Sequence, residues 1–377
     1  MLPPDLRDET YAALRDHIVP SAAQLRWCEI PWRRSLWEAV PEAVRCETPI
    51  LLWAMDGNPL GMTCGNGIMG RERIWADPRV RELATHFVPA ADDAGRLTRG
   101  AGPDCELFRA VAEQGHYGGV TIPTNTRQGI YAMTPDGVLL ASENARDPRV
   151  VVAMMRGALA RWSTRSQDSA RAMPAGASSI EVAHPGLVLR VYARDLPVGD
   201  AVTGDWNQDH LWLTVSEARA LVPSGAVGAR AVASEDLALR IACKHLVDDV
   251  HGQSIAFPVE AVEQAVLGSE IVALEGGTVT LRFTGSMRAS HTGIWPIRGS
   301  EDVASPAEQV RGYDMDLLGR GVFDRDAGQF RTLEIVAAGM RWGATQYNWR
   351  ADDLAPRPLG IVFVLCEDDR YVAPALD

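Results

Sequence analysis

The sequence predicts an α/β domain in its first half and a strand-rich, antiparallel α+β domain in its second half. In the first half, a short and continuously apolar run at residues 50–55 lies between segments of helical periodicity, the pattern of a strand covered on both faces. In the second half, alternating apolar runs follow one another across glycine-containing turns, which is typical of hairpins in an antiparallel sheet.

A polar segment of small residues at 163–178 separates the two halves and is typical of a linker. The length of 377 residues also suggests two domains. We therefore expect a helical arm at 1–31, an α/β domain at 32–162, a linker at 163–178 and a strand-rich domain at 179–377.

The first helix of the α/β domain is predicted to begin near Trp32. Apolar Leu36, Val40 and Val44 follow at near-helical spacing, as expected for one buried face. Pro41 lies inside this pattern and predicts a kink or a break, because proline removes a backbone donor.

Two Asp-Pro pairs predict helix starts, because aspartate caps a helix and proline suits its first position. They are Asp77–Pro78 and Asp147–Pro148. A further helix carries an apolar face around Phe108 and ends at Gly115. The apolar faces of these three helices are Val80, Leu83, Ala84 and Phe87; Leu107, Phe108, Val111 and Ala112; and Val151, Met154, Met155, Ala158, Leu159 and Trp162.

The remaining elements of the first half are strands and one glycine-rich loop. Residues 56–67 form the predicted loop, and residues 87–91 form a second short strand that ends at Asp92-Asp93. Two apolar runs within 129–142 flank a Thr-Pro-Asp-Gly turn and predict a hairpin.

The second half is predicted to be mainly strands. Residues 187–193 and 211–215 alternate, and residues 359–365 form a late core strand. Hairpins are predicted at 270–284, across Glu275-Gly276-Gly277, and at 321–336. One helix begins at Ser234, with Leu237, Ile241 and Val247 expected to be buried.

With this order of elements, residues 32–162 resemble the thioredoxin-like fold, and more narrowly the divergent bacterial thioredoxin-like proteins. The likeness is carried by Pro49-Ile-Leu-Leu-Trp before the glycine-rich loop, by Asp77-Pro-Arg-Val and His-Phe-Val-Pro after it, and by the Thr-Pro-Asp-Gly turn. The C-terminal domain resembles uncharacterised bacterial domains that follow similar modules, a likeness that implies no activity.

The resemblance places the reactive thiol of the family at Cys64. A helix N-terminus beside the sulfur would lower the pKa of Cys64 and favour a nucleophilic thiolate. The sequence departs from the family at two positions: Gly67 stands where a resolving cysteine would lie, and Gln128 stands where a proline would face the thiol. Dithiol exchange needs that second cysteine, so we expect single-thiol chemistry, either redox or adduct-forming, on a small thiol or electrophile.

Several neighbours complete this predicted catalytic site. Arg127, Gln128 and His116 are expected to line the facing wall and to supply charge or a proton. Thr63, Asn66 and Thr126 are expected to contact the substrate, and they complete the predicted set.

Two other interpretations of the role of Cys64 stay open. The cysteine could be a small buried residue in a domain that only binds a partner protein, or it could hold Cu(I) together with Met62. Met55 and Met69 are further candidate thioethers.

A second candidate metal site lies in the C-terminal half. His245 and Asp249 are four residues apart, and His251 and His291 could complete a transition-metal site. A helix-surface ion pair is the simpler interpretation of the same spacing. No resident cofactor is otherwise expected.

Composition limits the partners. The net charge of −12, without a block of lysine and arginine, argues against nucleic acid. No window approaches 18 uninterrupted apolar residues, and residues 1–17 lack the pattern of a secretory signal. The six cysteines have no paired spacing, which favours reduced thiols and a cytoplasmic location without membrane contact.

Overall fold

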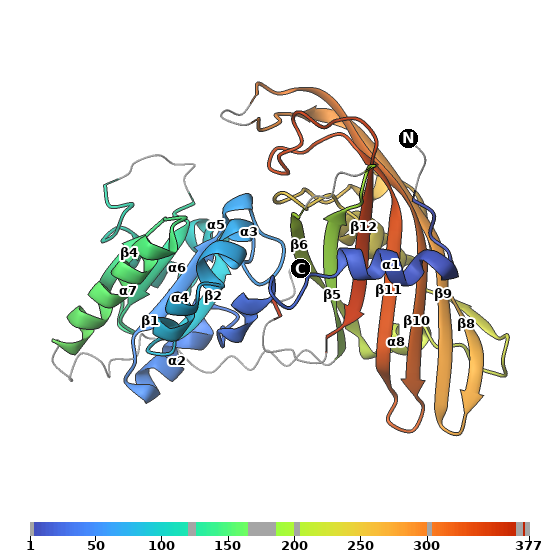
Figure 1. Cartoon of the computed structure of the whole chain (residues 1–377), viewed down its shortest axis with the longest axis horizontal. Helices are drawn as coiled ribbons and strands as arrows, with labels where there is room; N and C mark the ends of the chain where they lie inside the picture. The colour runs from blue at the N-terminus through green and yellow to red at the C-terminus, as the bar shows by residue number, and fades with distance from the viewer. Residues whose placement is uncertain are drawn as a thin grey trace. The chain divides into compact units, whose positions relative to one another are not determined.

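A computed structural model describes residues 4–119, 126–164, 186–199, 204–299, 304–366 and 372–373. The chain divides into two compact units (Figure 1). The small-sheet unit comprises Ser21–Ala183 and Asp368–Leu376, and the large-sheet unit comprises Met1–Pro20, His184–Glu367 and Asp377. The structure thus assigns the start of the predicted 1–31 arm to the large-sheet unit, and most of the predicted 163–178 linker lies outside the described residues.

The small-sheet unit contains a four-stranded mixed sheet in the order β2-β1-β3-β4. Strand β1 runs parallel to β2 and antiparallel to β3, and β3 runs antiparallel to β4. The strands span β1 Ile50–Met55, β2 Val88–Asp93, β3 Gly129–Met133 and β4 Leu139–Glu143. The predicted strands and hairpin of the first half are confirmed.

Helices cover this sheet on both faces, which explains the continuous apolar run of β1. Leu51 and Trp53 pack into one core with the helices on their side, and Leu52 and Ala54 pack into a second core on the opposite side. The helices are η1 Arg26–Glu29, α2 Leu36–Cys46, α3 Gly65–Met69, η2 Gly70–Trp75, α4 Pro78–Ala84, α5 Ala94–Arg99, α6 Pro103–Ala112 and α7 Pro148–Ser163.

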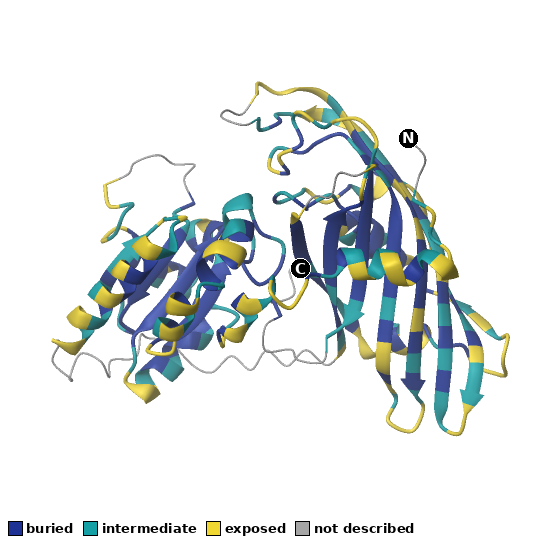
Figure 2. Cartoon of the chain, viewed as in Figure 1, coloured by how far each residue is buried: buried dark blue, intermediate teal, exposed yellow. Residues whose placement is uncertain are grey.

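Four tryptophans form the centre of the first of these cores. Trp27, Trp32, Trp53 and Trp75 are fully buried, and their contacting rings lie 4.8–6.3 Å apart. Figure 2 shows the strands of this sheet as mostly buried. These aromatic residues therefore stabilise the core beneath β1.

Side-chain caps explain where several of these helices begin. Asp77 and Asp147 accept hydrogen bonds from backbone N–H groups at the starts of α4 and α7, as predicted. Ser35 caps α2 in the same way, and α2 continues as one assigned helix through Pro41.

The sequence analysis missed two helical segments. The predicted loop 56–67 ends at Cys64, the N-cap of α3, and η2 continues the helix from Gly70. Helix α5 follows β2 directly. Glycines disfavour helix in isolation, but Gly70 packs against the Trp53 ring, so that a Cβ there would lie 3.0 Å from it. Tertiary packing thus overrides local propensity at α3 and η2.

The large-sheet unit is built on one eight-stranded sheet in the order β6-β5-β12-β11-β10-β9-β8-β7. All neighbouring strands are antiparallel, and the sheet is strongly curved (Figure 1). The strands are β5 Gly186–Asp195, β6 Trp206–Thr214, β7 Arg230–Val232, β8 Val262–Glu275, β9 Thr278–Trp295, β10 Ala307–Asp324, β11 Gln329–Trp342 and β12 Arg357–Leu365. The predicted hairpins are β8–β9 and β10–β11.

Short helices pack on this sheet. Helix α1 (Asp8–Ile18) lies against β5, β11 and β12, where Tyr11 Oη donates to Glu334 Oε1 at 2.9 Å. Its Asp8 pairs with Arg282 at 2.6 Å. The other helices are α8 Val215–Ala220, α9 Glu235–Arg240, η4 Ile241–His245 and η5 Val259–Ala261. The predicted helix after Ser234 corresponds to α9 and η4.

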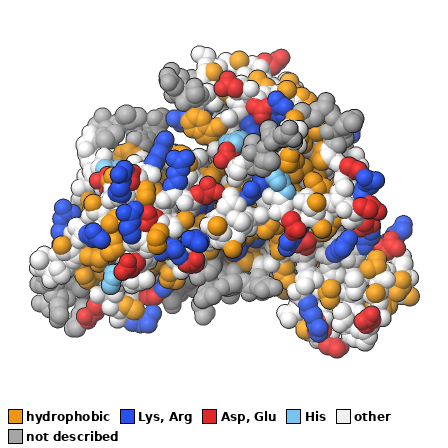
Figure 3. Space-filling model, in the orientation of Figure 1, with side chains coloured by type: hydrophobic (Ala, Val, Ile, Leu, Met, Phe, Trp, Pro, Cys, Tyr) orange, Lys and Arg blue, Asp and Glu red, His pale blue; other side chains and the backbone are white. Residues whose placement is uncertain are grey.

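The surface in view carries lysine and arginine interspersed with aspartate and glutamate (Figure 3). None of the six cysteines forms a disulfide, and all six lie in the described residues. Within the described ranges, none of the helices has the length and hydrophobicity required to cross a membrane.

Candidate functional site

The predicted reactive cysteine lies at the carboxyl end of β1, in a loop that folds back on Asp56. Cys64 occupies the N-cap position of α3. Its backbone N–H donates to the carbonyl oxygen of Asp56 at 2.9 Å, and the Thr63 hydroxyl donates to the same oxygen at 3.1 Å. These two hydrogen bonds fix Cys64 relative to the end of the strand.

A buried arginine that the sequence analysis missed stabilises this loop. Arg71 in η2 is fully buried, and its guanidinium donates to the carbonyl oxygens of Pro59, at 2.8 and 3.1 Å, and Gly61. The guanidinium also lies over the Trp27 ring, 5.2 Å from the centroid. Arg71 therefore satisfies loop carbonyls that burial would otherwise leave without donors.

Gln128 faces the thiol from the residue before β3. Its side-chain oxygen lies 3.6 Å from the sulfur of Cys64 and 3.5 Å from the side-chain nitrogen of Asn66. Its side-chain nitrogen donates to Asp56 Oδ2 at 2.9 Å. The structure thus brings together Cys64, Asn66 and Gln128, and it adds the carboxylate of Asp56, which the sequence analysis had not named.

The electrostatics of this cluster oppose the expected activation of the thiol. Burial raises the pKa of Cys64, and the charge of Asp56 raises it further, while backbone N–H groups of Gly67 and Asn66 act in the opposite direction. Burial outweighs the helix N-terminus, so the predicted lowering of the Cys64 pKa is wrong in direction. Burial also raises the pKa of Asp56, against the hydrogen bond from Thr126.

Position 67, where the resemblance would place a second cysteine, is closed to any side chain in this conformation. A Cβ on Gly67 would lie 2.3 Å from Oγ1, 2.7 Å from Cγ2 and 3.0 Å from Cβ of Thr63. Thr63 is itself fully buried. This loop conformation therefore requires a glycine at position 67. Thr63 was predicted to contact the substrate, but its hydroxyl points into the loop.

Two other residues of the predicted site, Arg127 of the facing wall and the substrate contact Thr126, bind other groups. The guanidinium of Arg127 pairs with Glu113 near the end of α6, and its carbonyl accepts from Tyr131 Oη at 2.6 Å. Thr126 is buried, and its carbonyl accepts from Thr98 at 2.7 Å. The Thr126 side chain hydrogen-bonds to Asp56 and is thereby linked indirectly to the Cys64 cluster.

His116 contacts the backbone of Gln128 rather than the thiol. Its Nε2 lies 3.3 Å from the Gln128 carbonyl oxygen, its Nδ1 lies 2.8 Å from Ser142 Oγ, and its ring stacks on Tyr131. Burial lowers the pKa of His116. His116 and Ser142 line an open hollow of about 400 Å³ beside β4.

The predicted metal ligands of the C-terminal half do not come together. His245 pairs with Asp209 at 2.9 Å, and His251 lies between Asp195, at 3.2 Å, and Asp205, at 3.1 Å. Asp249 follows the end of η4, so its spacing from His245 does not fall on one helical face. His291, the fourth candidate, stacks on Trp295.

The described part of the chain holds no group of three or more His, Cys, Asp or Glu residues arranged to bind a metal. Near Cys64, Met55 is buried in the core, while Met62 is half-buried.

Comparison of the chain with protein-family models, curated proteins and solved structures gives no significant match.

Proposed function

We propose that the small-sheet unit is a thioredoxin-like domain in which Cys64 acts as a single exchangeable thiol on small disulfides, thiols or electrophiles. The strand order β2-β1-β3-β4, with β1 parallel to β2 and followed by a hairpin of β3 and β4, supports this assignment. So does the position of Cys64 at the helix start after β1.

The observation that carries the proposal is the set of polar groups around one sulfur. Backbone N–H groups of Asn66 and Gly67 interact favourably with the thiolate form. Gln128 Oε1 lies 3.6 Å from the same sulfur and accepts from the protonated thiol. Both forms of Cys64 thus have hydrogen-bond partners, which suits a thiol that gains and loses its proton.

The proposed reaction has two exchange steps. The Cys64 thiol first loses its proton to solvent, and the thiolate attacks a disulfide RS–SR to give Cys64–S–S–R and RS⁻. Gly67 offers no second thiol, so a thiolate R′S⁻ from solution attacks the mixed disulfide and returns Cys64 as thiolate with RS–SR′. The raised pKa leaves less thiolate at neutral pH but makes that thiolate intrinsically more nucleophilic.

Mapping of mixed disulfides tests this reaction. The native protein is incubated with 2-hydroxyethyl disulfide at pH 8 and quenched with acid, and its cysteine peptides are quantified by mass spectrometry. Cys46 is exposed and serves as the internal comparison. We expect a mixed disulfide on Cys64, reversed by added 2-mercaptoethanol and absent from the Cys64→Ser variant.

A second candidate is a thioredoxin-like binding module without thiol chemistry, and the raised pKa of Cys64 favours it. It predicts that Cys64 stays unmodified in the native protein while Cys46 is modified, and that Cys64 reacts only in urea. The Cu(I) site at Cys64 and Met62 stays a separate prediction. Stoichiometric Cu(I) uptake that survives Cys64→Ser would exclude it.

A further inference from the structure

Arg311 is a buried cation in the large-sheet unit. It lies in β10, is 6% exposed, and donates to the carbonyl oxygens of Ile255 at 2.7 Å and Ala256 at 2.8 Å. The centre of its guanidinium lies 4.0 Å from the ring centroid of Phe257. Burial lowers the pKa of Arg311 to about 10, because a buried site disfavours an unneutralised charge.

The neighbouring buried arginines differ from Arg311 because carboxylates neutralise them. Arg350 pairs with Asp195 at 2.6 Å and with Asp248 at 2.9 Å. Arg341 pairs with Asp353 and lies 3.5 Å from Asp248.

Among the described residues, no aspartate or glutamate pairs with Arg311; its contacts there are carbonyl dipoles and aromatic rings. These contacts satisfy donors but do not cancel the charge, and burial of an uncompensated charge is costly.

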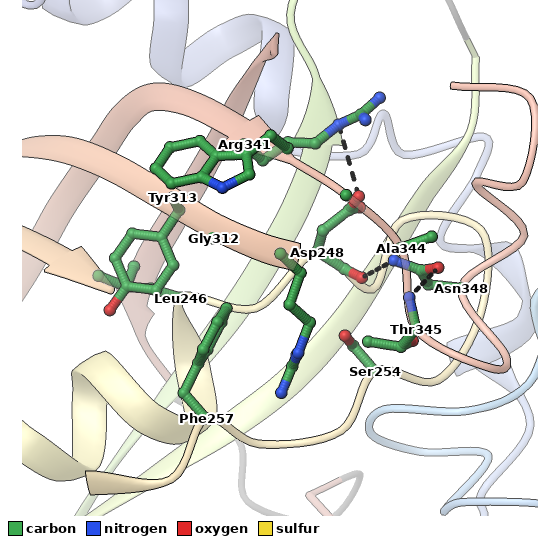
Figure 4. Close-up of a pocket in the computed structure, with 13 residues that line it drawn as sticks. Leu246, Asp248, Ser254, Phe257, Gly312, Tyr313, Arg341, Ala344, Thr345 and Asn348 are labelled. Atoms are coloured by element: carbon green, nitrogen blue, oxygen red, sulfur yellow. Dashed lines mark hydrogen bonds and ion pairs between the residues drawn. The ribbon is translucent and has the colours of Figure 1, made fainter. Parts of the chain in front are cut away.

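Arg311 lines a small cavity together with Thr345 and the ion-paired Asp248 and Arg341. Figure 4 shows the last three side chains around it. The cavity has a volume of about 10 Å³, roughly the space of one water molecule. Thr345 lines it and is 2% exposed. Its Oγ1 has no hydrogen-bond partner among the described residues, although its backbone N–H donates to Asn348 Oδ1 at 2.9 Å.

The loop that carries Thr345 is held close to β10. Gly343 has a φ of +74°, and a Cβ on it would lie 2.1 Å from the carbonyl oxygen of Val310. In the same loop Trp349 adopts a φ of +55°, which is unusual for a bulky side chain. The loop thus maintains a constrained conformation beside the cavity.

We propose that this cavity binds a small monovalent anion of about the size of chloride. Arg311 supplies the charge, and the hydroxyl of Thr345 turns to donate a hydrogen bond. The cavity volume excludes a larger organic anion. Of Arg311, Arg341 and Arg350, Arg311 is the one without a carboxylate partner among the described residues. An anion in the cavity would pair with Arg311 and would accept a hydrogen bond from the buried Thr345 hydroxyl.

Hydrogen exchange in two sodium salts tests this site. Exchange of peptides covering residues 254–257, 309–313 and 343–348 is measured by mass spectrometry in sodium chloride and in sodium gluconate of equal ionic strength. Gluconate is too large for the cavity, so it controls for screening. With chloride at about ten times its Kd, we expect these peptides to exchange about tenfold more slowly than in gluconate.

Two variants assign the effect to the cavity. Thr345→Val keeps the side-chain shape and removes a hydroxyl without a partner among the described residues, so it should fold normally while the chloride effect falls severalfold. Arg311→Met should abolish the effect. Thr284→Val, at an exposed position of β9, is the matched control and should keep it.

Equal exchange in chloride and gluconate would overturn the proposal. So would a chloride effect that is unchanged in folded Thr345→Val. The Thr345→Val result stands on its own if Arg311→Met does not fold.

Discussion

Replacement of Gly67 by alanine should destabilise the small-sheet unit, although alanine is normally the better helix residue. The added Cβ would lie 2.3, 2.7 and 3.0 Å from three atoms of Thr63. Thr63 is fully buried and β-branched, so it has no free rotamer into which to move.

The expected magnitude follows from two opposing effects. Overpacking of a buried site costs about 1–3 kcal/mol, and three close contacts on a rigid side chain favour the upper half of that range. Replacing a helical glycine by alanine by itself increases the free energy of unfolding by up to about 1 kcal/mol. We therefore expect a net loss of about 1–2 kcal/mol in the free energy of unfolding.

A matched glycine provides the control for this prediction. Gly157 lies in α7, and a Cβ there would meet no atom within 4 Å. Gly157→Ala should therefore stabilise the protein by about 0.5–1 kcal/mol. Urea unfolding, followed by the fluorescence of the buried tryptophans, measures both variants.

A double-mutant cycle isolates the contact itself. In a Thr63→Ala background, most of the steric conflict is removed, so Gly67→Ala should cost at least about 1 kcal/mol less than in the natural sequence. If Gly67→Ala were as stabilising as Gly157→Ala, or equally costly in both backgrounds, the packing argument for a closed position 67 would be refuted.

Two further predictions concern the buried Arg71 and the half-buried His251. Arg71→Met removes the donors to the loop carbonyls, so we expect a loss of about 2 kcal/mol or more in unfolding free energy and faster alkylation of Cys64; unchanged alkylation would contradict the role of Arg71 in holding the loop. Burial alone would lower the pKa of His251, but the hydrogen bonds that its ring N–H groups donate to Asp195 and Asp205 raise it from 6.5 to about 9. The stability that this pairing contributes, at most about 3 kcal/mol, is complete below about pH 6.5 and is lost as pH rises through about 9. The urea midpoint of the large-sheet unit should fall over that interval, and His251→Gln should flatten the dependence; an equally steep fall in the variant would exclude His251 as its source.

Much of the small-sheet unit could be predicted from local chemistry. Asp77 and Asp147, each followed by proline, predicted where α4 and α7 begin, and the apolar run of β1 predicted a strand covered on both faces. The resemblance placed Gln128 opposite Cys64, and the two side chains lie 3.6 Å apart because Gln128 precedes β3, which pairs directly with β1.

Other features depend on tertiary packing and could not be predicted. The glycines of α3 and η2 gave a loop pattern, and only the packing of Gly67 against Thr63 and of Gly70 against Trp53 explains a helical segment there. Asp93 was interpreted as the end of a strand, although it also caps α5. Sequence alone does not distinguish a buried arginine such as Arg71 from the many exposed ones.

The predicted metal site failed for a geometric reason. The spacing of His245 and Asp249 was interpreted as one helical face, but η4 ends at His245. Similarly, the expected lowering of the Cys64 pKa considered the helix N-terminus alone. Burial of the sulfur and the charge of Asp56 became known only from the folded chain.

The pH dependence of Cys64 alkylation tests most directly whether Asp56 controls this thiol. The rate at which iodoacetamide modifies the Cys64 peptide is measured from pH 6 to 11 in the natural protein and in Asp56→Asn, with Cys46 as the internal reference. We expect the natural Cys64 to titrate above the usual value of about 8.5, and Asp56→Asn to lower that pKa, because the variant removes a negative charge beside the thiolate. A natural Cys64 that titrates at or below Cys46, or an Asp56→Asn variant with an unchanged pKa, would contradict this account.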